Sequence, residues 1–193
     1  HCPGNVYHLR RAEILIEAGM LRSAERELQL AEACGTSQEK LSVLKSRLLR
    51  FEEENGLSRA QEELQLAANK NGETALLCLE QGLLLLEARK DLWSAKRILK
   101  RASEMPEEIH MSGERTSLLA RAACGATRLW TGEAEDGLLE LSSAINRLLP
   151  IAGSLDTIRP ILALLLLERS HYLATHKEPE AAAKDLRIGL TLC

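Results

Sequence analysis

Aromatic side chains are scarce in this sequence. Phe, Trp and Tyr make up only 3% of its 193 residues, whereas 45% of the residues are hydrophobic. A core with so few rings has to be closed by Leu and Ala, which favour helices over strands. The length allows one globular domain or about five helical hairpins. Composition therefore favours an all-α protein.

The sequence also lacks a basic surplus, paired cysteines and long apolar runs. Its 25 Lys and Arg stand against 28 Asp and Glu, for a net charge of −3, so a nucleic-acid partner is not favoured. The five cysteines never form a Cys-x-x-Cys pair, which indicates reduced thiols rather than a disulfide framework or a zinc site. No apolar run approaches the roughly 20 residues that cross a bilayer. We expect a cytoplasmic or nuclear protein without a membrane partner or a cofactor.

One short stretch recurs along the chain. Residues 24–31, AERELQLA, return as AQEELQLA at residues 60–67, and a weaker copy, AKRILKRA, occupies residues 95–102. A spacing of about 36 and then about 35 residues is typical of repeat arrays, in which each unit buries its apolar face against its neighbours. The repeats predict an array rather than a single closed core.

Apolar residues follow the helical period in every part of the array, and Gly or Pro separates the periodic segments. In the first unit, for example, Gly19 divides a helix over residues 6–18 from one over residues 21–33. Thr36 and Glu39 have the spacing of a capping box, which would start a helix running to about residue 54 and carrying Phe51 inward. We predict one domain over residues 1–193, with units at about 5–36, 37–71, 72–106, 110–150 and 154–193.

The first unit resembles the tetratricopeptide repeat in its small and apolar residues, Ala12, Gly19, Ala24, Leu28 and Ala31. The resemblance implies a right-handed α-α superhelix, a solenoid of about five helical hairpins. Because the sequence begins with His1 rather than Met, we expect a fragment of a larger scaffold protein. The same frame recurs as Leu48, Ala60, Leu64 and Ala67 in the second unit and as Leu83, Ala95, Leu99 and Ala102 in the third.

The resemblance further implies that the first helix of each unit lines a concave groove. Acidic residues outnumber basic ones at the groove positions, and leucines lie between them. We expect this groove to hold a basic and partly apolar helix or extended segment of another protein; the alternative is that these are ordinary solvated helix faces. The predicted groove residues are Leu9, Arg10, Glu13, Glu17, Lys45, Leu49, Glu52, Glu53, Glu80, Leu84 and Glu87.

Motifs of catalysis are missing from the sequence. It has no Gly-rich phosphate loop, no Gly-x-Ser-x-Gly elbow and no His-Glu-x-x-His pair, so we do not predict an enzyme. His171 and His176, with Glu168 nearby, have a spacing that aligns poorly for a metal site. Two other functions stay open: an RNA-binding helical repeat, or the regulatory, non-catalytic region of a larger enzyme.

The remaining features belong to the later units. The apolar first helices of the fourth and fifth units would need cover from the array itself, from a further chain or from more of the same protein. Trp93 and Trp130 stand beside turns, where we expect them to cap the core. A modest basic strip that includes Arg97, Lys100 and Arg101 falls on the second helix of the third unit, which this architecture turns outward.

Overall fold

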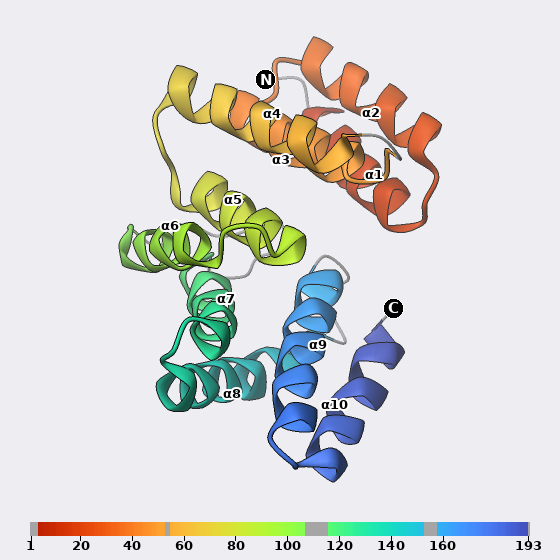
Figure 1. The fold of residues 1–193 in the computed structure, drawn as a ribbon. Helices are drawn as coiled ribbons and strands as arrows, with labels where there is room; N and C mark the ends of the chain where they lie inside the picture. Colours follow the sequence, from red (N-terminus) through yellow and green to blue (C-terminus); the bar gives the residue numbers. More distant parts are fainter. Residues whose placement is uncertain (1–3, 53–54, 107–115, 153–157, 193) are drawn as a thin grey trace. The chain divides into compact units, whose positions relative to one another are not determined.

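The computed structural model describes residues 4–52, 55–106, 116–152 and 158–192, and the regular structure within these ranges is entirely helical (Figure 1). Each predicted hairpin contains one pair of the helices. In these ranges they are α1 (Gly4–Glu17), α2 (Leu21–Ala33), α3 (Gln38–Leu49), α4 (Gly56–Asn71), α5 (Ala75–Ala88), α6 (Leu92–Glu104), α7 (Thr116–Trp130), α8 (Ala134–Ala152), α9 (Arg159–Thr175) and α10 (Pro179–Leu192).

The start and the end of α3 differ from the prediction. The prediction of a capping box at Thr36 and Glu39 is wrong. Ser37 is the residue before the helix and its side chain makes no cap, and the buried Oγ1 of Thr36 has no hydrogen-bond partner. Glu39 does not reach back along its own helix because its carboxylate accepts a hydrogen bond from Thr74. The helix also ends at Leu49, which leaves Phe51 in the following turn with 53% of its surface exposed.

Packing divides the chain into two compact units, His1–Glu80 and Gln81–Cys193, which we describe separately as the N-terminal and the C-terminal unit. In the N-terminal unit, α1 packs on α2 and α3, and α3 packs on α4. The repeated frame supplies this core, since Ala24, Leu28, Ala60 and Leu64 are all at most 2% exposed. Full burial of each leucine contributes about 1.5 to 3 kcal/mol.

In the C-terminal unit, α7 packs against α6, α8 and α9. Two glycines let α7 and α8 approach closely: a Cβ on Gly125 would lie 2.8 Å from the backbone nitrogen of Leu141, and one on Gly137 would lie 2.7 Å from the Cβ of Arg128. The array therefore covers most of the apolar surface that the sequence placed on the fourth unit. The buried residues of this surface are Leu119, Ala122, Ala123, Ala126 and Leu129.

The remaining helix pair, α9 and α10, closes the C-terminal unit. Arg169 of α9 donates to Asp185 of α10 with both ends of its guanidinium, at 2.6 and 2.7 Å. Asp185 is 3% exposed, so the pair is held away from water, where bidentate geometry contributes most.

In the part of the chain that the structure describes, none of the helices combines the length and the apolarity that crossing a membrane requires.

Candidate functional site on the first helices

The first helices of the three N-terminal hairpins are joined by one group of charges, which we call the Arg47 cluster. Arg47 of α3 lies between Glu13 of α1, at 3.3 Å, and Glu80 of α5, with which it also forms an ion pair. Arg10 pairs with the second oxygen of Glu13 at 3.0 Å, and Arg50 pairs with the second oxygen of Glu80 at 3.2 Å. Each carboxylate is thus held by two guanidinium groups.

The two carboxylates of the Arg47 cluster are buried. Glu13 is 2% exposed and Glu80 is 1% exposed. Burial raises the pKa of Glu13 above its ordinary value, although the charges of Arg47 and Arg10 act in the opposite direction. Burial also opposes the charge of Arg47, but the attraction and hydrogen bond of Glu80 together with the charges of Glu13 and Glu17 outweigh it and hold the pKa of Arg47 above its ordinary value. Breaking such a pair leaves an uncompensated charge away from water, so the cluster holds α1, α3 and the start of α5 together within the N-terminal unit.

The structure separates the described groove residues into three sets by exposure. Glu17, Glu52 and Glu87 are exposed and keep their acidic groups at the surface. Leu9, Glu13, Glu80 and Leu84 are buried and present little surface to a partner. Three more, Arg10, Lys45 and Leu49, are only partly exposed. Arg10 pairs with Glu13, Lys45 pairs with Glu32 at 3.1 Å, and Leu49 is the last residue of α3. Glu53 lies outside the described residues.

A second polar group, which we call the Trp130 cluster, joins first helices in the C-terminal unit. Glu168 of α9 is 2% exposed. Arg89, which follows α5, donates to both oxygens of Glu168 at 2.8 Å, and the indole Nε1 of Trp130 at the end of α7 donates to Oε2 at 2.8 Å. The guanidinium of Arg89 also lies 5.2 Å from the centre of the Trp130 ring. Trp130 therefore contributes a polar contact as well as packing.

Aromatic rings continue from Trp130 along α9. The ring centres of Trp130 and His171 are 4.9 Å apart, and the rings of Tyr172 and His176 stack at 3.9 Å. His171 and His176 are exposed. Glu168, which we weighed as a metal ligand with these histidines, is instead bound by Arg89 and Trp130. Across the described ranges, no group of three or more His, Cys, Asp and Glu side chains is arranged to hold a metal ion.

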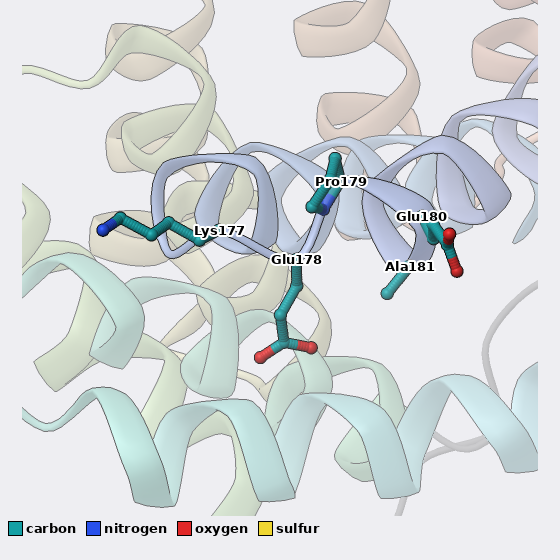
Figure 2. Close-up of a pocket in the computed structure, with 5 residues that line it drawn as sticks. All are labelled: Lys177, Glu178, Pro179, Glu180 and Ala181. Carbon is teal, nitrogen blue, oxygen red and sulfur yellow. The ribbon is translucent and has the colours of Figure 1, made fainter.

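An open hollow of about 410 Å³ lies at the turn between α9 and α10 and is lined by residues 177–181. Figure 2 shows the amine of Lys177 and the carboxylate of Glu180 pointing away from each other, and the carboxylate of Glu178 pointing in a third direction. The polar groups do not converge on one point, so this hollow has no arrangement suited to holding a small molecule.

Comparison with known proteins gives a likeness of fold. No family model matches the chain, and no curated protein matches it. The solved structure MamA AMB-1 C2221 matches 98% of this chain over 98% of its own, with a TM-score of 0.50 and 14% identity. The structure MamA MSR-1 C2 matches 97% of this chain over 95% of its own, with a TM-score of 0.49 and 13% identity.

The fold resembles that of MamA. At this level of identity the likeness concerns the fold alone, and it confirms the predicted class: an all-α array of helices paired in sequence, about five hairpins in the manner of tetratricopeptide repeats. Partner binding by the groove residues stays a prediction.

Sequence reasoning missed Arg47, the residue that joins the two buried acids of the site. Arg47 was left out of the predicted groove, although it binds two of the acids placed there. The sequence held one signal for this role of Arg47. It is an arginine between two leucine-rich stretches, and the neighbouring first helices carry Glu13 and Glu80. Because Arg47 and Arg50 neutralise those two acids, the N-terminal part of the surface is less acidic than predicted.

Proposed function

We propose that the chain is a non-catalytic protein-interaction scaffold whose first helices hold a basic, partly apolar segment of another protein. The distribution of charge carries this proposal. The acids of the Arg47 cluster are buried, whereas Glu17 at the end of α1 and Glu52 just beyond α3 lie at the surface, where Glu52 forms an exposed ion pair with Arg59 that a partner's basic side chain can replace. The acidic character available to a partner is therefore concentrated at the C-terminal ends of these two helices.

Apolar contact area is present at the same end of α3. Phe51 is 53% exposed in the turn that follows the helix, and Leu49 is half-buried at the last helical position. A partner with lysine or arginine beside leucine would place its charges near Glu17 and Glu52 and its apolar groups near Phe51. In such an interface the charges set register and encounter rate, while the apolar area supplies most of the affinity.

The Arg47 cluster supports this function by making the surface rigid. Its buried ion pairs hold α1, α3 and the start of α5 in one register, so the exposed residues between them are fixed before a partner arrives. A surface that is already ordered loses less conformational entropy on binding. The likeness to MamA supports the array on which this proposal is built.

The test compares two double charge reversals of equal size. Glu17→Lys with Glu52→Lys alters the proposed surface, and Glu25→Lys with Glu62→Lys makes the same change of charge at exposed positions of the second helices α2 and α4. The probe is a fluorescein-labelled helical peptide of lysine and leucine, and binding is measured by fluorescence anisotropy at low and at physiological salt. Far-UV circular dichroism checks that both variants stay folded.

We expect the first-helix variant to bind the peptide about tenfold more weakly and the second-helix variant to bind as the unmodified chain does. An equal loss in both variants would show that only net charge matters, and the proposal would be wrong. Unchanged binding in the first-helix variant would also exclude it.

A further inference from the structure

We propose a second interaction surface on the outer face of α6, made by Trp93, Arg97, Lys100 and Arg101, that binds an acidic and partly apolar segment of a protein. This surface differs from the first-helix site in both location and sign of charge. It does not rest on the function proposed above. The N-terminal residues of that site, Glu17 and Glu52, lie in the other compact unit.

The geometry of α6 sets this face apart. Ala95, Leu99 and Ala102 are fully buried on the side of the helix that packs against its neighbours, which include α7 (Figure 1). Residues three and four apart share a helix face, so Trp93, Arg97 and Lys100 lie together on the opposite side, where all three are exposed. Arg101 extends the same exposed surface.

Trp93 is the apolar anchor of this surface. We expected it to cap the core, but 64% of its surface is exposed. The amine of Lys96 lies 5.0 Å from the centre of its ring, and the same amine is held by Glu133. Glu133 is bound in turn by Arg128 at 2.8 Å. The indole is therefore held in place by Lys96, which is itself bound through Glu133 to Arg128. Much of the indole surface stays exposed to a partner.

Tryptophan and arginine are the residues most often found at the energetic centre of protein interfaces. An exposed tryptophan held in place loses little entropy on binding. Trp93 beside Arg97 therefore has the composition of an interface anchor rather than of an ordinary solvated helix.

The charge of the face selects an acidic partner. Two acids lie beside Arg97 and Lys100: Asp91, whose carboxylate caps the helix by accepting from the backbone nitrogen of Ser94 at 2.9 Å and also attracts Arg97, and Glu104, which reaches Lys100 only at 3.9 Å. Both side chains of that last pair are about two-thirds exposed, 67% and 65%, so the pair is weak. Lys100 can exchange it for a partner carboxylate.

A protein segment fits this face better than a nucleic acid does. The four residues of this surface lie on one helix of 13 residues, which spans about 20 Å, with Asp91 at one end and Glu104 at the other. Binding to a phosphate backbone draws on a longer basic stripe, and the whole chain carries a net charge of −3. Carboxylates spaced along a short helix or strand, with one apolar residue for Trp93, match the face.

The experiment measures binding of a fluorescein-labelled peptide of glutamate, aspartate and leucine by anisotropy. Peptides with lysine in place of the acids and a single-stranded RNA are tested in parallel. Two variants remove the surface: Arg97→Glu with Lys100→Glu, and Trp93→Ala. The matched control is Arg22→Glu with Arg26→Glu, which reverses two exposed charges on α2. Circular dichroism melting checks folding, and Trp93→Phe provides a milder change if Trp93→Ala is unstable.

The proposal expects the acidic peptide to bind through the α6 face, whereas binding of the lysine peptide, which the first-helix site would take, should not change in the α6 variants. Both surface variants should weaken the acidic peptide at least about tenfold, as loss of an interface anchor does, and the α2 control should leave it unchanged. Tighter binding of RNA than of the acidic peptide would assign the face to nucleic acid and overturn the proposal. Absence of binding, or equal binding by all folded variants, would overturn it as well.

Discussion

Replacing Arg47 by methionine tests the Arg47 cluster directly. Methionine fills much of the arginine volume but leaves Glu13 and Glu80 with one guanidinium each. Removing one partner of a buried ion pair costs about 3 to 5 kcal/mol. Because Arg10 and Arg50 still neutralise the two acids, we expect the lower end, a loss of about 3 kcal/mol in the free energy of unfolding.

The loss should depend on pH in a defined direction. Burial already raises the pKa of Glu13, and Arg47 acts to lower it, so the variant should raise it further. A carboxyl group whose pKa is raised by folding binds its proton more tightly in the folded state, so its contribution to stability falls as the pH rises through its folded value. The deficit of the variant should therefore be smaller near about pH 5 than near about pH 7.

Urea denaturation followed by circular dichroism measures both effects. Arg26→Met, an exposed position on α2, is the control and should change stability by less than about 0.5 kcal/mol. A loss below about 1 kcal/mol for Arg47→Met would refute this reasoning.

Three further substitutions test packing and polar contacts by the same denaturation assay. Leu64→Ala, at a fully buried position, should cost about 2 to 5 kcal/mol, whereas Leu66→Ala, at a site 64% exposed, should cost less than about 0.5; equal losses would contradict the assigned helix face. Gly125→Ala should cost about 1 to 3 kcal/mol by overpacking α7 against α8, and a neutral result would show that the two helices separate easily. Trp130→Phe removes a donor to the buried Glu168 and should cost about 1 to 3 kcal/mol; full stability would mean that Arg89 alone satisfies that carboxylate.

Local patterns were enough to predict most of the helices. The predicted bounds of α2, residues 21–33, agree with Leu21–Ala33, because amphipathic periodicity and the flanking Gly19 and Gly35 are properties of adjacent residues. The end of α3 was not predictable in the same way. Glu39, which we expected to cap the helix, bonds to Thr74 of the next hairpin, and this contact depends on how the hairpins stack.

The candidate site was predicted less completely, for a related reason. Matching the repeats position by position pairs Glu13 with Leu49, whereas the residue that contacts Glu13 is Arg47. Adjacent first helices are staggered, and repeat matching does not supply the stagger. The prediction that Trp93 caps the core was wrong. It gave more weight to the nearby turn than to the position of Trp93 on α6, on the face opposite Leu99. Glu17 and Glu52 are exposed, and their binding of a partner stays a prediction.

Arg89 limits how this sequence can vary. It follows α5 with a φ of 50°, in the left-handed region that Gly19, Gly35, Gly72 and Gly132 occupy at other turns of the described chain. Holding a residue other than glycine there costs about 1 to 2 kcal/mol, yet this side chain binds both oxygens of Glu168. Variation at position 89 is therefore constrained in two ways. Glycine adopts a positive φ readily but has no side chain to reach Glu168 on α9. Residues long enough to reach Glu168 are strained by the positive φ.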